Sequence, residues 1–535
     1  MSSERRMLLQ GSILAFAGIL TKLIGFAYRI PMANLLGNVG NGIYSVAFGI
    51  YNIALTLSSL SMPLAVSKLV SSRLAKNEAK NARRAFWDTL LFAAAVGGVA
   101  ALVLWFGADA LEGIYKEPGL ARPLRVLSPT TFVVAFLGTF RGWFQGHGNM
   151  VPTAVSQVME QIVNAVVSVL AAWQLTRIFA DDSAVDAYGA AGGTIGTLAG
   201  AAVGLAFVVT LFFRSREPEG LEGAPTEDHA LIYRALILTV IPVVLSQTIY
   251  QIGYTLDDLI FANVMASKGF LKEEYQALQG VFNTQYNQMV NLPVSIASAM
   301  AASTVPGIVS ASVRRDRRES HRKITAVLKL NMAIAIPSAV GLAVLARPIM
   351  ELLFTSLGEK EALAAHLLQA GSLAAVFYAL STITTAILQA SDYMGLPVRH
   401  CAVSLVIHAA LVYLLLRFTN WGVYALIVGN VTFPLLVSVL NCRALSRALR
   451  YRFKPGRTFA VPFVSALAMG VVTWGSSTLL RLIGCPRVLT LIAAIALSVA
   501  AYGFLLLRLH CFADRQLLEL PMGGKLLKLS RRLER

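Results

Sequence analysis

The sequence predicts an all-α membrane protein that crosses the bilayer about fourteen times. Hydrophobic residues make up 56% of the 535 residues, charged residues only 14%, and the mean hydropathy is +0.65. Apolar runs of spanning length recur along the whole chain, and glycine, proline or charged residues bound each of them. This composition does not suit a soluble globular fold.

The expected spans follow one another with short connections, and their ends are set to within about four residues by the ends of the apolar runs. They are 8–35, 42–71, 85–108, 123–145, 152–178, 187–213, 231–265, 280–311, 323–346, 363–390, 397–417, 422–444, 459–482 and 488–510.

The first apolar run, from Leu8 to Leu36, contains the cations Lys22 and Arg29. A cation in hydrocarbon costs roughly 2.5 to 3.5 kcal/mol, so such residues usually face a water-filled interior or a partner. We expect the rest of the chain to enclose that interior. The run is also too long and too charged for a cleavable signal, so Met1 is expected to stay on the protein.

Basic residues gather in short clusters between the apolar runs, where positive charge sets the orientation in the membrane. The formal net charge is +18. The clusters 73–84, 314–323, 443–457 and 508–535 are expected in the cytoplasm, and the less basic loops 37–41, 180–186 and 268–274 outside. We therefore predict a plasma-membrane protein with both termini in the cytoplasm and no nucleic-acid partner.

The cysteines show no metal-binding pattern. Cys401, Cys442, Cys485 and Cys511 lie within or at the ends of apolar runs, without a CxxC or Cys/His spacing. We expect buried, reduced thiols, no metal site and no cofactor. A coupling ion, Na⁺ or H⁺, stays open, as does the driving force.

An internal repeat relates residues 41–70 to residues 279–308. At a constant offset Gly42 matches Gly280, and Met62 matches Met300. About six spans separate the copies, so both enter the membrane from the same side and the repeat axis lies along the membrane normal. The alternative is chance similarity between apolar, glycine-rich helices.

The repeat predicts two six-helix lobes. We expect an N-terminal lobe at 1–214, a polar cytoplasmic linker at 215–230, a C-terminal lobe at 231–450, two additional helices at 451–512 and a basic cytoplasmic tail at 513–535. The tail could lie on the anionic leaflet or end in solvent.

Charged residues of opposite sign occupy the first helix of each lobe. GFAYR at 25–29 and GYTLDD at 253–258 set Arg29 opposite Asp257. Cations of one lobe and carboxylates of the other could pair across a cleft or bind a charged substrate. Lys68 and Asp258 lie near helix ends, where reaching the headgroups is an equal alternative.

Amide side chains recur at a spacing of four in two places. Asn283, Asn287 and Asn291 form one series, and Gln247 and Gln251 form another. Each series predicts a polar stripe on one helix face. Such stripes could line a hydrated cavity or form hydrogen bonds between helices.

The segment RGWFQGHGNMVPTAVSQVMEQIVN, 141–164, predicts a tight cytoplasmic turn followed by a helix with Pro152 in its first turn. Further along, Gln157, Glu160, Gln161 and Asn164 place a carboxylate among amides on roughly one face.

Together with the first-span pattern LTKLIGFAYRIPMANLLG and the paired lobes, this segment resembles the stage V sporulation protein B group of polysaccharide-transport proteins. That group belongs to the multidrug/oligosaccharidyl-lipid/polysaccharide (MOP) exporter superfamily and is related to MurJ-type lipid II flippases. The resemblance covers essentially the whole chain.

The resemblance implies two lobes of six helices around a central cavity, with added C-terminal helices, here about 459–510, that form a lipid-facing groove for an undecaprenyl tail. It also implies that Lys22 and Arg29 meet a pyrophosphate group. Tyr28 stands where flippase relatives often have another arginine, so the sequence departs there from the family's pattern.

The candidate substrate-binding residues combine cations for phosphates with amides for sugars. They are Lys22, Arg29, Asn52, Lys68, Arg141, Gln157, Glu160, Asn164, Gln247, Gln251, Asp257, Asp258, Asn283, Asn287 and Asn291.

The function expected from these features is translocation of an undecaprenyl-pyrophosphate-linked oligosaccharide, such as a lipid II-like peptidoglycan precursor, by alternating access. The carrier would be a monomer that serves cell-wall, polysaccharide or spore biosynthesis, with cell-wall synthesis enzymes as candidate partners. An ion-coupled multidrug exporter is the alternative, favoured by Asp257, Asp258 and Glu160 and opposed by Lys22 and Arg29. A membrane glycosyltransferase would need a sizeable loop with catalytic motifs, and the sequence has no HExxH or DxD motif, so we do not expect an enzyme.

Overall fold

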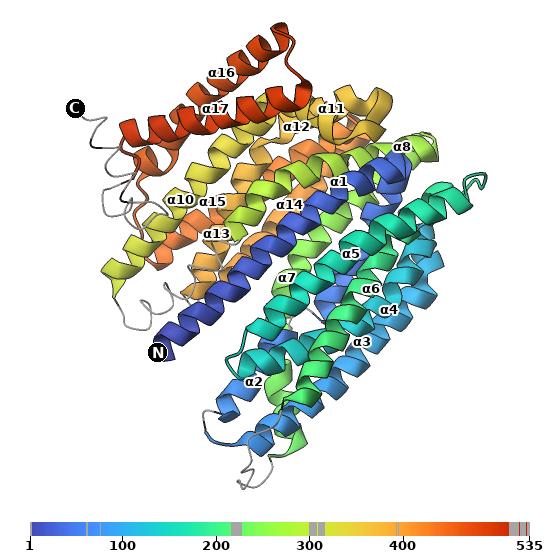
Figure 1. The fold of residues 1–535 in the computed structure, drawn as a ribbon, viewed down its shortest axis with the longest axis vertical. Coiled ribbons are helices and arrows are strands. Elements are labelled where there is room, and N and C mark those ends of the chain that lie inside the picture. Colours follow the sequence, from blue (N-terminus) through green and yellow to red (C-terminus); the bar gives the residue numbers. More distant parts are fainter. Residues whose placement is uncertain are drawn as a thin grey trace. The chain divides into compact units, whose positions relative to one another are not determined.

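The computed structural model describes residues 3–59, 62–74, 76–215, 227–298, 308, 316–391, 393, 395–512, 524 and 531 (Figure 1). All regular secondary structure in these ranges is helical. The helices divide into two compact units, Met1–Thr284 and Gln285–Arg535. The prediction of an all-α fold is confirmed.

The first unit contains eight α-helices and the first π-helical turn. They are α1 (Ser3–Ser58), α2 (Met62–Leu74), α3 (Ala79–Tyr115), α4 (Ala121–Gly146), α5 (Val151–Ile178), α6 (Val185–Arg214), α7 (His229–Ser267), α8 (Lys272–Gly280) and η1 (Val281–Tyr286), whose last two residues belong to the second unit.

The second unit continues with helical residues 287–298. After them come α10 (Arg317–Val344), α11 (Ala346–Leu353), η2 (Thr355–Lys360), α12 (Glu361–Gly371), α13 (Leu373–Ala390), α14 (Gly395–Phe418), α15 (Val423–Ala448), η3 (Gly456–Ala460), α16 (Val461–Leu482) and α17 (Arg487–Arg508).

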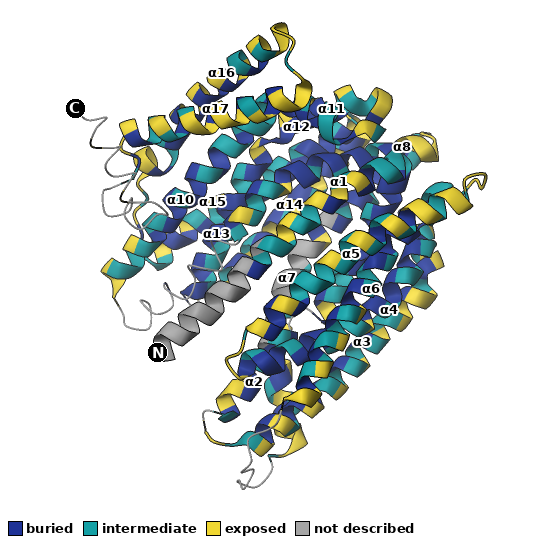
Figure 2. Cartoon of the chain, viewed as in Figure 1, coloured by how far each residue is buried: buried dark blue, intermediate teal, exposed yellow. Residues whose placement is uncertain are grey.

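Ten of the described helices are long and apolar enough to cross a membrane. The other four predicted spans, 8–35, 42–71, 231–265 and 280–311, fall on α1, α2, α7 and residues 280–298, so the count of fourteen stays a prediction. Large apolar side chains are exposed along α3, α5, α14, α16 and α17 (Figure 2). Exposure of such continuous apolar faces is unfavourable in water and favourable in lipid.

Small residues let α5 and α6 pack closely. Gly192, Gly196 and Gly200 recur at a spacing of four on α6. A Cβ at Gly196 would overlap Ser168 of α5, and one at Gly192 would lie 2.7 Å from the Cα of Ala172. Helices in a bilayer associate by close packing and not by a hydrophobic force between them, so this stripe of glycines sets the register of α5.

The two copies of the sequence repeat meet at a pair of glycines in the first unit. A Cβ at Gly42 would overlap the carbonyl oxygen of Gln276, and a Cβ at Gly280 would overlap that of Asn38. Gly280 follows Gly42 by 238 residues, and Gln276 follows Asn38 by the same number. The two contacts are therefore equivalent under the repeat, as contacts across a twofold axis are.

The offset of the repeat does not extend to the charged residues that precede each copy. Arg29 and Asp257 are 228 residues apart, so the spacing that relates Gly42 to Gly280 does not relate these two charges. Between the charges and the glycines, α1 breaks at Gly37, whose φ of 66° lies in the left-handed region that favours glycine.

The second unit is held together by packing of α16 and α17 on α10. The Tyr502 hydroxyl of α17 donates to the carbonyl of Ala333 on α10 at 2.9 Å. Ala466 and Met469 of α16 are buried in the same hydrophobic cluster. The two helices form an antiparallel hairpin whose other faces are exposed (Figures 1 and 2).

Parts of the predicted domain organisation lie outside the described residues. Of the linker at 215–230 only its ends are described, and of the tail at 513–535 only residues 524 and 531. The boundary between two lobes at the linker stays a prediction. In the structure α7 and α8 pack within the first unit, against α1.

The prediction that all four cysteines are buried is wrong for two of them. Cys401 and Cys511 are buried, whereas Cys442 and Cys485 are partly exposed, and all four are free thiols. Cys485 lies in the turn between α16 and α17.

The beginning of α7 is attached to the ends of α2 and α3 by polar contacts. Arg73 Nε donates to Glu227 Oε2 at 2.9 Å, and the Glu227 backbone N–H donates to Asn81 Oδ1 at 2.9 Å. His229 Nδ1 lies 2.9 Å from Asp88 Oδ2. These contacts hold the chain that enters α7 against the α2–α3 connection.

Removing one α6 glycine should destabilise the first unit. We expect Gly196→Val to force α5 and α6 apart and to cost about 1 to 3 kcal/mol, the usual cost of overpacking. Thermal unfolding of the detergent-solubilised protein, followed by size-exclusion chromatography, measures the effect. Gly107→Val on α3 is the control, because nothing lies within 4 Å of a Cβ there. Equal melting temperatures for both variants would contradict the close packing.

Loss of Arg73 should release the start of α7. In Arg73→Ala we expect faster hydrogen exchange of residues 227–235, because the Glu227 carboxylate loses its guanidinium partner. Lys80→Ala, at an exposed position on the same connection, should leave the exchange unchanged. Unchanged exchange in both variants would show that the contact does not hold α7.

Candidate functional site

Two cations of α1 lie beside the polar stripe of α5. Lys22, Gly25 and Arg29 are spaced three and four residues apart and so share one face of α1. A Cβ at Gly25 would lie 3.2 Å from the Gln161 side-chain nitrogen, so glycine leaves room for this amide. Lys22 and Arg29 are exposed. We call Lys22 and Arg29, together with Gln157, Glu160, Gln161 and Asn164, the α1–α5 face.

Tyr28 joins the two helices of this face. It is buried beside Met32 and Tyr44, and its hydroxyl accepts a hydrogen bond from Asn164 Nδ2 at 3.5 Å. Asn164 Oδ1 in turn accepts from the Ser168 hydroxyl at 2.9 Å. Tyr28 therefore packs α1 on α5 and does not carry charge into the face.

Arg141 of α4 is paired within the protein. Its Nη2 lies 2.7 Å from Glu160 Oε2, and its Nε donates to the Ser156 hydroxyl at 2.9 Å. The Arg141 side chain is 11% exposed and that of Glu160 is 29% exposed. Of the predicted cations, Arg141 thus orients Glu160, while Lys22 and Arg29 are accessible.

The predicted carboxylates of α7 are buried. Asp257 and Asp258 are 6% and 5% exposed. Asp258 Oδ1 accepts from Asn283 Nδ2 at 2.6 Å and from Gln279 Nε2 at 3.2 Å. The Asn283 amide also lies 3.3 Å from the Ser45 hydroxyl of α1. We call Asp258, Gln279, Asn283 and Ser45 the Asp258 cluster.

The three asparagines predicted to form one stripe have different surroundings. Asn283 belongs to the Asp258 cluster, Asn287 Oδ1 accepts from Asn430 at 3.4 Å, and Asn291 is exposed. Residues 281–286 form a π-helix, in which a spacing of four no longer returns to the same face. A local change of helix type therefore separates residues that a regular α-helix would align.

The remaining predicted site residues lie apart or cannot be placed. Asn52 is half-buried on α1, and Lys68 is exposed on α2. Gln247 and Gln251 belong to α7, and their side chains lie outside the described residues.

Two polar residues near Asp258 were not predicted from the sequence. Gln279, which precedes Asn283 by four residues, contacts Asp258 directly. Glu117 lies in the turn between α3 and α4 and is fully buried. The spacing of Gln279 from Asn283 could have indicated the first of them, but no sequence pattern marks the second.

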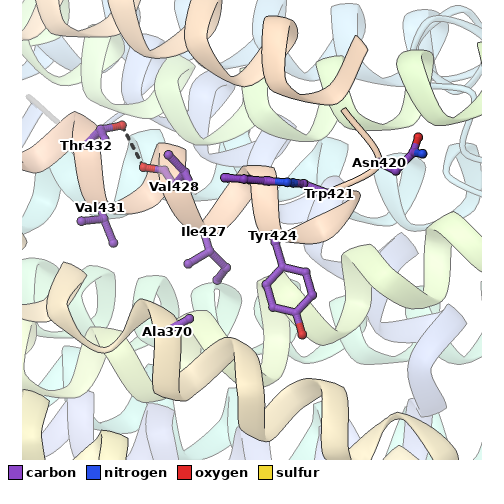
Figure 3. A pocket seen from close by; sticks show the side chains of 8 residues that line it. All are labelled: Ala370, Asn420, Trp421, Tyr424, Ile427, Val428, Val431 and Thr432. Carbon is purple, nitrogen blue, oxygen red and sulfur yellow. Dashed lines mark hydrogen bonds between the residues drawn. The ribbon is translucent and has the colours of Figure 1, made fainter. Parts of the chain in front are cut away.

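A separate pocket of about 710 Å³ lies in the second unit (Figure 3). Ala370 of α12 and Ile427, Val428 and Val431 of α15 give it an apolar lining. Figure 3 also shows Trp421 and Tyr424 on its wall, while the Thr432 hydroxyl donates to the carbonyl of Val428. No predicted site residue lines this pocket, and its surface suits apolar groups.

Comparison with known proteins places the chain in a family. The family described as "Polysaccharide biosynthesis protein" matches residues 8–312. Stage V sporulation protein B of Bacillus subtilis (strain 168) is 24% identical over 96% of this chain and 98% of its own length. The lipid II flippase MurJ of the same organism is 24% identical over 76% of each chain.

Solved structures share the fold. An inward-facing multidrug resistance MATE family transporter of the MOP superfamily matches with a TM-score of 0.64 and 15% identity over 82% of this chain and 99% of its own. A lipid II flippase MurJ in an inward closed conformation matches with a TM-score of 0.61 and 15% identity over 92% and 99%. The predicted resemblance is confirmed, and so is the expectation of a protein that is not an enzyme. The chain is thus a multi-pass membrane protein that belongs to the polysaccharide biosynthesis protein family.

Proposed function

We propose that the chain is a flippase that moves an undecaprenyl-pyrophosphate-linked oligosaccharide, of the kind of lipid II, across the plasma membrane by alternating access. Both termini would lie in the cytoplasm, and the protein would act as a monomer in cell-wall or polysaccharide biosynthesis. The likeness of the chain to the MurJ flippase and to stage V sporulation protein B supports this proposal.

The observation that carries the proposal is the α1–α5 face. Lys22 and Arg29 are seven residues apart, about 10 Å along a helix, and the Gln161 amide lies beside the glycine between them. Cations bind phosphate oxygens through charge-assisted hydrogen bonds. Amides such as Gln157 and Gln161 offer both donors and acceptors to sugar hydroxyls. A pyrophosphate-linked sugar needs this combination.

The lipid tail of such a substrate would stay in hydrocarbon. Only the polar head then needs a hydrated path, and apolar faces such as those of α16 and α17 are suited to accompany the tail. The polar head of the substrate would then match the α1–α5 face, and its apolar tail would match the apolar side chains that other helices expose.

An ion-coupled multidrug exporter of the MATE type is a second candidate. Its support is the likeness in fold to a MATE transporter and the buried pair Asp257 and Asp258. Buried carboxylates suit binding of a cationic drug, or of Na⁺ or H⁺ as a coupling ion. The exposed cations of α1 favour an anionic substrate instead.

Transport in liposomes tests the proposal. We expect the wild-type protein to expose a labelled undecaprenyl-pyrophosphoryl sugar on the other leaflet. Arg29→Ala and Lys22→Ala should each slow this at least tenfold, since a charge-assisted hydrogen bond contributes about 1.5 to 3 kcal/mol. Arg177→Ala, an exposed cation near the end of α5, is the matched control and should flip the lipid at the wild-type rate.

Two other outcomes would count against the flippase or against its phosphate site. If no lipid moves, while a cationic dye is exported in a manner that Asp257→Asn abolishes, the exporter replaces the flippase. If Arg29→Ala and Arg177→Ala flip the lipid equally well, the α1–α5 face is not the phosphate site.

The ion pair between Arg141 and Glu160 should contribute mainly to structure. We expect Arg141→Ala to lower the melting temperature by leaving Glu160 without its partner, and the double variant with Glu160→Ala to recover part of the loss. A coupling energy of about 0.5 to 3 kcal/mol is the usual range for residues in contact. Additive effects in this double-mutant cycle would show that the pair contributes nothing.

A further inference from the structure

The turn between α3 and α4 has a constrained backbone. Lys116, at the end of α3, has a φ of 52°, and Gly119 has a φ of 88°. A Cβ at Gly119 would lie 2.5 Å from the Cβ of Ala187 on α6. The turn therefore follows one path over the neighbouring helices.

Side chains of α7 and α8 satisfy three backbone carbonyls at alternate positions of this turn. Asn263 Nδ2 donates to the carbonyl of Ile114 at 3.1 Å, and Gln276 Nε2 donates to that of Pro118 at 3.5 Å. Between them, the Tyr275 hydroxyl donates to the carbonyl of Lys116. These bonds close α8 onto the turn.

Glu117 lies inside this closed contact. It is 0% exposed, and neither of its carboxylate oxygens has a hydrogen-bond partner among the described residues. A charged carboxylate without a partner is one of the most costly groups to bury. A neutral carboxyl group loses far less hydration, so the closed turn favours the protonated form.

A neighbouring carboxylate adds to that preference. On α7 it faces Asp258, whose negative charge disfavours a second carboxylate nearby, and on α8 it faces Tyr275. Other titratable groups on the turn and on the elements packed against it include Glu112, Tyr115, Lys116, Arg122, Asp186, Tyr188, Asp257, Lys272, Glu273 and Glu274. Of these, Glu112 Oε2 already accepts from the Ala121 backbone at 2.9 Å.

Burial raises the pKa of Glu117 to about 8, the Gln276 amide nearby offsets part of that rise, and the charge of Asp258 adds to it. The ordinary pKa of a glutamate is about 4.3. At a pH between these two pKa values, Glu117 is protonated in the closed turn but not in an opened and hydrated turn. Raising the pH through this range weakens the closed state, and lowering it stabilises the closed state.

We propose that Glu117 is a proton-binding site that fastens the α3–α4 turn to α8. With the proton bound, Tyr275 and Gln276 stay on the turn. When the proton leaves, the carboxylate needs water, and the turn must part from α8. Gln276 is also the residue whose carbonyl contacts Gly42, so the site lies next to the meeting point of the two repeat copies.

The role of this proton in transport rests on the proposed function, whereas its binding does not. The turn 116–120 lies on the side of the membrane that the charge distribution predicts to be outside. Protons of that compartment would then favour the closed state, which makes H⁺ a candidate for the coupling ion.

Infrared difference spectroscopy of the full-length protein in liposomes tests the binding directly. As the pH is raised from 5 to 9, we expect the carbonyl band of a protonated carboxyl group to disappear in the wild type, with a midpoint well above the ordinary range of glutamate. Glu117→Gln should show a smaller change, because it lacks the carboxyl group of Glu117. Glu273→Gln, at an exposed glutamate on the first turn of α8, is the control and should keep the full change.

Hydrogen exchange of residues 272–280 in the same samples keeps the test independent of transport and of folding defects. It should accelerate at high pH in the wild type and in Glu273→Gln, beyond the intrinsic effect of pH on exchange, and should show no added acceleration in Glu117→Gln. A wild type without the protonated carboxyl band at neutral pH, or equal behaviour of both variants, overturns the proposal. Lipid transport that fails in every variant would count against the flippase while leaving the proton site intact.

Discussion

Close backbone contact at glycines is the constraint on which the first unit depends. In hydrocarbon the helices gain nothing from hiding apolar side chains, so their association relies on van der Waals contact and on satisfied polar groups. Gly42 and Gly280 meet the carbonyls of Gln276 and Asn38 in two equivalent contacts. The glycines of α6 provide the same closeness for α5. At these positions any larger side chain would move a whole helix.

This close packing also decides which polar groups are buried, which are paired and which stay exposed. Glu160 is held by Arg141, and Asp258 by Gln279 and Asn283, whereas Glu117 is buried without a hydrogen-bond partner among the described residues. The cations Lys22 and Arg29 stay exposed beside the amides of α5. Paired or buried carboxylates beside accessible cations are suited to an anion, and this asymmetry is the main physical reason why we propose a phosphate-bearing substrate in preference to a cationic drug.

The second unit differs in character. Its pocket between α12 and α15 is lined largely by apolar and aromatic side chains, and α16 and α17 expose apolar faces. Some polar groups there are satisfied in pairs, as in the contact between Tyr502 and Ala333. The charged candidate residues are thus concentrated in the first unit, whereas the described part of the second unit exposes mainly apolar surfaces.

Composition and periodicity by themselves determined the all-α membrane fold, the repeat that aligns Gly42 with Gly280, and the presence of Lys22 and Arg29 within an apolar run. These properties follow from hydropathy, which acts locally along the chain. Only the tertiary structure decided that Arg141 pairs with Glu160, that Tyr28 packs α1 on α5, and that a π-helix separates Asn283 from Asn287 and Asn291. Glu117 is the extreme case, because its burial comes from residues of α7 and α8 far along the chain, and no neighbouring residue reveals it. A polar group in a membrane protein takes its role from the partner that it finds, and that partner is chosen by helix packing.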